Sequence, residues 1–312
     1  MRYFIRKLTG LIITLLIVSM LAFLAFALIP GDPARQRLGT EATEGLVQEL
    51  REEMGLNRPL PVRYGQWMRE LVTGDMGTSF RYHVPVRELI GDKIPITIVL
   101  TIMSFVMILL LSIPISLIGA RYEQTLPDRV LLILNQVMMA VPSFFIGILL
   151  TFLFGLVLRW FTPGGYVSYS EDLWGFLGYL ILPAVAIALP RAAMTTKMFR
   201  NSLLAEMNKD YVRTALSRGN SRFRTLVQHV IKNGFLPVLT LLGMTVAEII
   251  TSSIVIEQVF GIPGLGRILI TSISHRDYPV VKAIIILLAV IILGLNVLVD
   301  ILYQRLDKRI EI

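Results

Sequence analysis

The chain has 312 residues, of which 54% are hydrophobic, and it carries a formal net charge of +8. Many apolar residues fall in runs of about 20, the length needed to cross roughly 30 Å of hydrocarbon, which excludes an ordinary soluble domain. The absence of cysteine excludes disulfides, thiolate metal sites and a cysteine nucleophile. The composition therefore predicts a bundle of membrane-spanning helices with no separate soluble domain.

The N-terminal region imitates a secretory signal peptide. Three basic residues precede the first apolar run: Arg2, Arg6 and Lys7. Ala25-Phe26-Ala27 resembles a cleavage site, but the run is longer than a usual signal core and is long enough to span. We therefore expect residues 1–10 to be a cytoplasmic N-terminus and residues 11–29 to be a retained first transmembrane helix.

The segment 30–95 separates the first apolar run from the second. Leu46, Leu50 and Met54 recur at helical spacing, and Gly55 is placed to end that helix. A second apolar stripe, closed by Gly74, consists of Tyr64, Trp67, Met68, Leu71 and Val72. We expect two amphipathic helices that pack on the bundle or lie on the membrane surface, with ligand gating as the alternative role.

Five further apolar runs follow: Ile96–Ile118, Val130–Leu158, Leu177–Met198, Leu236–Val255 and Val280–Leu302. The run that contains Pro142 is too long for a simple span and should tilt, kink or include an interfacial turn. The predicted fold class is thus an all-α membrane protein with six transmembrane helices.

The distribution of lysine and arginine predicts which side of the membrane each connection occupies. Basic residues precede the first run and follow the last, where they are Arg305, Lys308 and Arg309. Between the fourth and fifth runs lie Lys197, Arg200, Lys209, Arg213, Arg218, Arg222, Arg224 and Lys232. With six spans, both termini and the connection 199–236, called the basic loop below, should be cytoplasmic. Segment 30–95 should then be extracytoplasmic.

The basic loop contains a short predicted helix over Asp210–Gly219. Asp210 is placed to cap its N-terminus and Gly219 its C-terminus. Ala215 and Gly219 are four residues apart and share one face, which would let another protein approach the backbone closely. The alternative is a solvated basic loop that only obeys the charge rule.

This stretch also resembles a signature loop of ATP-binding-cassette (ABC) importer permeases, which reads Glu-Ala-Ala, three residues, then Gly. The matching residues are Arg213, Thr214, Ala215, Leu216, Ser217, Arg218 and Gly219, with Arg and Thr in place of Glu and the first Ala. The family pattern continues through His229, Asn233, Gly234, Leu236 and Pro237, where Gly234 departs from the usual Ala.

Similar matches run along nearly the whole chain. They include the segments 29–33, 55–60, 74–80, 141–144, 181–184, 255–266 and 276–280. Departures are His275, where Asn is usual, and Lys308, where the tail usually has Pro. The chain is identified as a member of the dipeptide, oligopeptide and nickel permease family, most similar to the first of its two permeases.

The resemblance implies a type I importer permease with residues 96–302 as its transmembrane core and 303–312 as a cytoplasmic tail. It implies no catalysis and no cofactor on this chain, with ATP and Mg on partner subunits. The implied partners are a second homologous permease, two ATPase subunits, an extracytoplasmic substrate-binding protein and membrane lipid, with no nucleic acid. Residues 213–219 would couple to an ATPase subunit. The location would be the bacterial inner membrane.

Three other patterns carry no chemistry. Gly261, Gly264 and Gly266 do not lead into the Lys and Ser or Thr of a phosphate loop. His275-Arg276-Asp277 imitates a kinase triplet, but no other kinase motif accompanies it. The three histidines, His83, His229 and His275, fall on opposite sides of the predicted membrane, which argues against a shared metal site.

Ionisable residues at membrane depth are functional candidates because their isolated burial in hydrocarbon is costly. Arg191, Glu248 and Glu257 are the candidates for a pore or gate. Glu257 is expected at the outer end of its span and Asp300 near the inner end of the last, where interfacial water could solvate them.

Two other function classes remain at this point: an ion-coupled secondary transporter and a membrane-embedded enzyme. The first usually has ionisable relays and repeated halves, and the second needs a nucleophile–base pair or a metal set. Neither pattern is evident. For an importer, the lack of a metal-ligand cluster favours peptide cargo over nickel or a nickel chelate.

Overall fold

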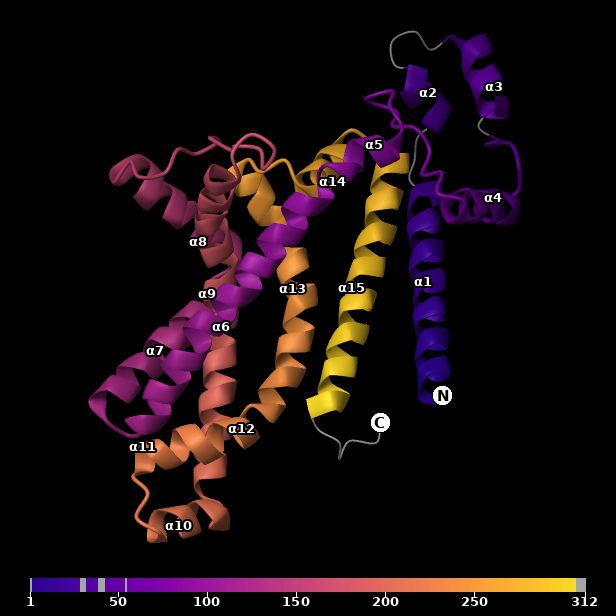
Figure 1. Cartoon of the computed structure of the whole chain (residues 1–312). Helices are drawn as coiled ribbons and strands as arrows, with labels where there is room; N and C mark the ends of the chain where they lie inside the picture. The colour runs from indigo at the N-terminus through magenta and orange to yellow at the C-terminus, as the bar shows by residue number, and fades with distance from the viewer. Residues whose placement is uncertain (1, 29–31, 39–42, 54, 307–312) are drawn as a thin grey trace. The chain divides into compact units, whose positions relative to one another are not determined.

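The computed structural model describes residues 2–28, 32–38, 43–53 and 55–306, which are almost entirely helical (Figure 1). Within these residues, the only β-structure is an isolated bridge between Thr78 and Pro85. The chain divides into two compact units, one of which comprises the chain to Ile96 together with Gly264–Leu293. The other comprises Thr97–Pro263 and the chain from Gly294 onward.

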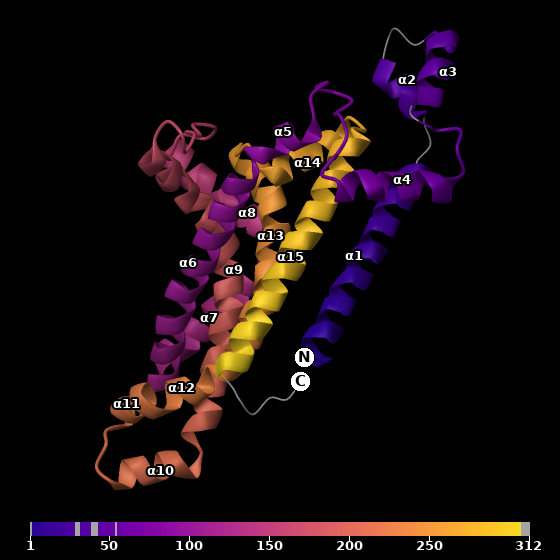
Figure 2. The same ribbon diagram turned by 45° about the vertical axis from the view of Figure 1, so that its right-hand side comes forward.

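The first unit begins with the long apolar helix α1 (Arg2–Leu28), which is followed by α2 (Pro33–Leu38), α3 (Glu44–Glu53), α4 (Leu60–Val72) and α5 (Val86–Gly91). It also contains α14 (Leu265–Ser274) and the first part of α15 (Tyr278–Leu306). Figure 2 shows α4 crossing the end of α1 at a steep angle, and the two helices are in contact.

The predicted amphipathic helices of segment 30–95 correspond to α3 and α4. Gly74, with φ +86°, ends α4 because its amide and that of Asp75 bond back to Leu71 and Glu70 at 3.1 and 2.9 Å. The Tyr64 hydroxyl lies 2.7 Å from that of Ser19 on α1. The stripe packs as expected except at Val72, which is 80% exposed and therefore does not belong to it.

A buried carboxylate fixes the turn between α14 and α15. Asp277 is fully buried and accepts hydrogen bonds from the Ser79 hydroxyl and from the backbone amide of Phe80 at 3.0 Å. Buried polar groups need such partners. The kinase-like triplet therefore has a structural explanation, in which Asp277 joins the loop after α4 to the start of α15.

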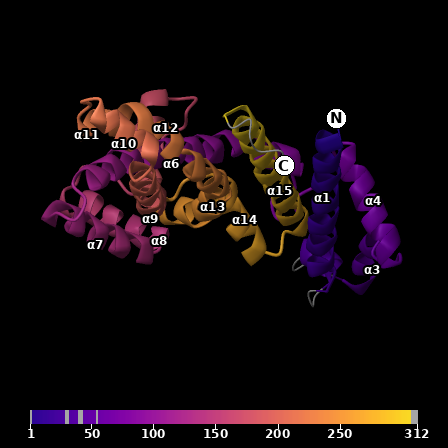
Figure 3. The same ribbon diagram turned by 90° about the horizontal axis from the view of Figure 1, so that it is seen from below.

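The second unit contains most of α6 (Ile94–Arg121), then α7 (Leu126–Ala140), α8 (Ser143–Leu150), the π-helix η2 (Thr151–Val157) and α9 (Leu173–Met207). It continues with α10 (Asp210–Ser217), α11 (Arg222–Thr225), η3 (Leu226–Val230), α12 (Ile231–Gly234) and α13 (Leu236–Phe260). α9 packs against α7, α8 and α13, and Figure 3 shows it between α7 and α13.

The long apolar run 130–158 is broken rather than straight. Val141 is extended, with φ −89° and ψ 125°, because the following Pro142 disfavours helical geometry in the residue before it. The helix therefore stops at Ala140 and restarts at Ser143, and the two parts are bent by 102°. The prediction of a kink at Pro142 is confirmed.

Among the described residues, five helices are long and apolar enough to cross a membrane, and counting the bent pair as one span gives six. Apart from Ile29, which lies outside the described residues, and the non-helical residues 141, 142 and 158, the apolar runs fall within these helices, but α9 is longer than its run. Its 35 residues measure about 50 Å at 1.5 Å per residue, more than the roughly 30 Å hydrocarbon core. The first part of the basic loop is therefore a direct extension of α9.

Candidate functional site in the basic loop and the charged residues of the bundle

The seven residues that match the signature loop lie on α10 and at its C-terminal end. The prediction that Asp210 caps the N-terminus of this helix is wrong. Lys209, with extended backbone, is the capping residue and makes no side-chain capping bond, while Asp210 is the first helical residue. Val212 is fully buried and anchors the helix to the rest of the unit.

Gly219 ends α10 in the way the sequence predicts. Its φ is +84°, a left-handed conformation that glycine adopts without penalty. Its amide bonds to Leu216 at 2.9 Å and the amide of Asn220 bonds to Ala215 at 3.3 Å, which forms a Schellman motif. A Cβ at Gly219 would meet no atom within 4 Å. The constraint on this position is therefore its backbone conformation and not crowding within the chain.

Much of the surface of α10 is uncovered by the described chain. Arg213, Thr214 and Leu216 are exposed, Ala215 is half-buried, and the backbone of Gly219 is open to its surroundings. Leu216 is exposed beside Ala215 and Gly219, whose small side chains would let another macromolecule approach the backbone of α10 closely. The structure therefore keeps this surface of the loop accessible.

A polar cluster ties α10 to the helices on either side of it. The Tyr211 hydroxyl donates to Glu206 on α9 at 2.7 Å and accepts from the side-chain amide of Asn233 on α12 at 3.3 Å. Burial raises the pKa of the Tyr211 hydroxyl above its ordinary value. A hydrogen bond to Glu206 raises the pKa of the Lys209 ammonium. Asn233, which matches the family pattern, thus helps to hold α10 in place.

Close contact between α9 and α12 explains the departure at Gly234. The Ser202 hydroxyl donates to the Gly234 carbonyl at 2.7 Å. A Cβ on Gly234 would lie 3.1 Å from the side chain of Leu203, so the usual alanine would require Leu203 to shift slightly. The rings of Phe199 and Phe235 pack edge to face at 5.5 Å beside this contact. Glycine here lets the returning chain lie close against α9.

A buried ion pair that is not evident from the sequence joins α7 to the extension of α9. Arg200 donates from Nε to Oδ1 of Asp128 at 2.8 Å and from Nη2 to Oδ2 at 2.6 Å. The side chains are only 11% and 3% exposed. The two residues are 72 positions apart in the sequence, so only the packing of α7 on α9 could reveal the pair.

Two weaker contacts join the turn after α6 to α11. The Arg121 guanidinium lies 4.7 Å from the centre of the Phe223 ring, and Arg222 lies 3.4 Å from Glu123. The turn after α6 and the helices α10 to α12 therefore gather at one end of the second unit.

Two of the three pore candidates come together. Arg191 on α9 and Glu248 on α13 form an ion pair at 2.6 Å, with both side chains partly exposed. Arg191 also lines a cavity of about 310 Å³ formed with the break at Pro142 and with Pro190 and Ser252. A charged pair with one member at a cavity between helices matches the usual environment of functional charges at membrane depth.

Glu257 lies apart from that pair and in a different environment from the one expected. It is 0% exposed and accepts a hydrogen bond from the Thr97 hydroxyl of α6 at 2.6 Å. Interfacial solvation is therefore not what accommodates Glu257, because protein groups surround it. The side chain of Asp300 and residues 307–312, which include Lys308 and Arg309, lie outside the described part of the chain.

His83, His229 and His275 are all exposed and belong to different segments. In the described ranges, no three His, Cys, Asp or Glu side chains are grouped closely enough to hold a metal ion.

Apolar helices of spanning length, one of them broken, and a basic loop with exposed residues on α10 are consistent with a multi-pass membrane transport subunit. Two family models match the chain: "Binding-protein-dependent transport system inner membrane component" over residues 112–312, and the corresponding N-terminal model over residues 1–101. The chain belongs to this family of ABC importer permeases, and it is an inner-membrane protein.

Curated relatives match over almost their entire length. A "Probable peptide ABC transporter permease protein" of Sinorhizobium fredii is 34% identical, with 99% of each chain covered. An oligopeptide transport system permease protein of Bacillus subtilis is also 34% identical, again over 99% of each chain. A glutathione transport system permease protein of Pectobacterium atrosepticum is 35% identical over 100% of this chain and 99% of its own.

Proposed function

We propose that this chain is the permease subunit of an ABC importer and forms half of a translocation pore for di- and oligopeptides. The observation that carries the proposal is the full-length similarity to permeases named for peptide, oligopeptide and glutathione transport. These names favour peptides over nickel as cargo. Membership of a binding-protein-dependent family argues against an ion-coupled secondary transporter.

ATP hydrolysis, in this proposal, takes place on separate subunits. The chain contains no phosphate-loop sequence that could hold a nucleotide. A complete importer would contain this permease, a second homologous permease, two ATPase subunits that bind ATP and Mg, and an extracytoplasmic substrate-binding protein. This chain would bind no cofactor of its own.

Both termini and the basic loop are proposed to be cytoplasmic, and segment 30–95 extracytoplasmic. The charge distribution supports this orientation, because short cytoplasmic connections of membrane proteins are enriched in Lys and Arg. The turn after α6 and helices α10 to α12 also gather at one end of their unit, where ATPase subunits could reach them together.

α10 is proposed to be the docking element for an ATPase subunit. Arg213, Thr214 and Leu216 are exposed, while buried Val212 and the polar cluster around Tyr211 hold α10 against the rest of its unit. Movement of a partner bound to α10 would be transmitted into α9, because only Asn208 and Lys209 separate the two helices.

The ion pair between Arg191 on α9 and Glu248 on α13 is proposed to line or gate the pore. Glu257, which lies apart from this pair, is proposed to hold α13 against α6 through Thr97.

The test is peptide uptake by Ala215→Trp and Gly219→Val variants produced with the partner subunits. A bulky residue at Ala215 should hold the ATPase away, because close packing does not absorb such a volume. Valine at Gly219 is disfavoured by the positive φ. Both variants should insert at normal abundance yet lose transport, with the ATPase released or its hydrolysis uncoupled from uptake.

Asn220→Val is the matched control, since it introduces the same side chain at the next residue, where φ is not positive. This variant should transport nearly normally. Variants at Ala215 and Gly219 that insert, retain the ATPase and transport at the unmodified rate would refute the docking role.

A further inference from the structure

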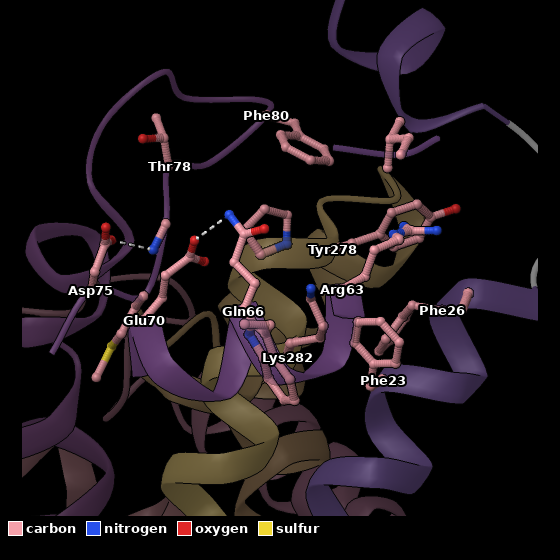
Figure 4. A pocket seen from close by; sticks show the side chains of 16 residues that line it. Phe23, Phe26, Arg63, Gln66, Glu70, Asp75, Thr78, Phe80, Tyr278 and Lys282 are labelled. Atoms are coloured by element: carbon pink, nitrogen blue, oxygen red, sulfur yellow. Dashed lines mark hydrogen bonds between the residues drawn. The ribbon is translucent and has the colours of Figure 1, made fainter. Parts of the chain in front are cut away.

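A cavity of about 330 Å³ in the first unit has no role in the proposed transport mechanism (Figure 4). It lies among the end of α1, the inner side of α4, the turn that follows α4 and the start of α15. This volume is within the range of roughly 300–1,000 Å³ that small-ligand sites occupy. Its wall is rich in aromatic rings, contributed by Phe23, Phe26, Trp67, Phe80 and Tyr278.

Two cations line this cavity, and neither is among the residues that form ion pairs in the described part of the chain. The Lys282 ammonium lies 5.0 Å from the centre of the Trp67 ring and 5.7 Å from that of Phe23. The Arg63 guanidinium lies 6.0 Å from the same Phe23 ring. Figure 4 shows Lys282 and Arg63 approaching the cavity from different helices. Two positive groups that share one small cavity favour an anion between them.

A third group at the cavity also lacks a partner. The hydroxyl of Tyr278 is buried and makes no hydrogen bond with any described residue. Such orphaned hydroxyls are uncommon in native proteins and call for a bound molecule or an ion. Tyr278 lines the same cavity as the two cations, so one anionic ligand could satisfy all three groups.

The opposite side of the cavity is acidic. Glu70 and Asp75 lie on one side in Figure 4, and Arg63 on the other. One oxygen of Glu70 accepts from Gln66 at 3.0 Å and one oxygen of Asp75 accepts from the Gly77 amide at 2.8 Å. Each carboxylate keeps a second oxygen for another donor. The cavity therefore has a positive and a negative end, which suits a zwitterion.

The position of the cavity relative to the membrane indicates the source of this zwitterion. The spans Arg6–Leu28 and Tyr278–Leu298 both have an end at the cavity, so it lies at the level of the lipid headgroups, where aromatic residues are typical. These two spans are also the least covered by the rest of the chain, with 17% and 22% of their apolar windows buried. Lipid can therefore reach the cavity along either helix.

We propose that this cavity binds the headgroup of a zwitterionic phospholipid, with phosphatidylethanolamine as the best match. The phosphodiester accepts hydrogen bonds from Lys282, Arg63 and the Tyr278 hydroxyl. The ethanolamine ammonium donates to Glu70 and Asp75, and the aromatic wall contacts the glycerol and the first methylenes. The proposal does not depend on the cargo of the importer.

The test uses the full-length permease, stripped of lipid in detergent and titrated with phosphatidylethanolamine, with binding followed by native mass spectrometry. Lys282→Gln and Arg63→Gln should each weaken binding by about tenfold or more, since each removes a charge-assisted hydrogen bond. Arg69→Gln is the matched control, because this exposed arginine lies on the same helix but does not line the cavity. It should bind like the unmodified chain.

Two further variants separate a binding role from a folding role. Lys282→Arg keeps the charge and should retain most of the affinity. Glu70→Gln should weaken phosphatidylethanolamine but leave phosphatidylglycerol unaffected, because the latter has no ammonium group.

Unchanged affinity in both Lys282→Gln and Arg63→Gln would overturn the proposal. Soluble O-phosphoethanolamine that competes at concentrations comparable to the lipid would show a site for free phosphate esters instead. Displacement of the lipid by cargo peptide would assign the cavity to transport, and it would also overturn the lipid assignment.

Discussion

Replacing Asp128 with asparagine should destabilise the permease more than any other single charge removal at this end of its unit. The carboxylate accepts two hydrogen bonds from Arg200 and a third from the Gln124 amide at 3.0 Å. Asparagine offers one acceptor oxygen and turns an amide NH₂ toward donors that already need acceptors. The guanidinium, only 11% exposed, would remain charged without a counter-ion.

Removal of one partner from a buried ion pair costs about 3–5 kcal/mol. For a chain of this size, such a loss lowers the melting temperature by on the order of 10 °C. The assay is thermal unfolding of the detergent-solubilised permease, followed by intrinsic fluorescence. Because Arg200 lies on the extension of α9 that leads into α10, the variant should also transport less at temperatures where it remains folded.

A matched control is Glu123→Gln, which breaks the more exposed pair with Arg222, whose side chains are 33% and 63% exposed. This loss should cost no more than about 1 kcal/mol. Asp128→Leu combined with Arg200→Met removes both buried charges and should recover most of the stability. Equal small shifts for Asp128→Asn and Glu123→Gln would refute the argument.

Three further predictions follow from the packing and the proposed orientation. Thr97→Val removes a donor to the buried carboxylate on α13 and should lower the free energy of unfolding by about 1–3 kcal/mol, measured by the same thermal assay. Trp67→Ala removes a ring stacked on α1 and should cost about 2 kcal/mol, whereas Val72→Ala, at an exposed position of the same helix, should cost little; equal losses would contradict the packing. In the cysteine-free chain, Thr78→Cys should react with an impermeant thiol reagent added to intact cells and Asn220→Cys should not, and the reverse pattern would invert the topology.

Local features of the fold could be predicted from the sequence because their causes are local. Glycine at 55, 74, 219 and 261 adopts positive φ at helix ends, as its lack of a Cβ allows. Pro142 breaks its run because proline restricts both itself and the residue before it. Apolar runs of spanning length identify the long helices in the same way. The predicted cap at Asp210 was wrong by one residue. The first residue of α10 depends on the backbone conformation of the short turn after α9, which the sequence pattern does not specify.

The pairings between distant residues could not be predicted. Asp128 and Arg200 are 72 residues apart, and Thr97 and Glu257 are 160 apart. Periodicity within one helix shows which face is apolar, but it does not show which charged residue on another helix will lie opposite. The expectation that interfacial water would solvate Glu257 failed for the same reason, since the helix that buries it is remote in sequence.

The docking role of α10 can be tested most directly by site-directed cross-linking. Ala215→Cys in the otherwise cysteine-free chain provides a single attachment point for a short photoreactive reagent in membranes that contain the assembled importer. If α10 docks the ATPase, Ala215→Cys should form an adduct with the ATPase subunit and Thr78→Cys should form none. Absence of an adduct from Ala215→Cys in an importer that remains assembled and active would contradict the docking role, as would an ATPase adduct from Thr78→Cys.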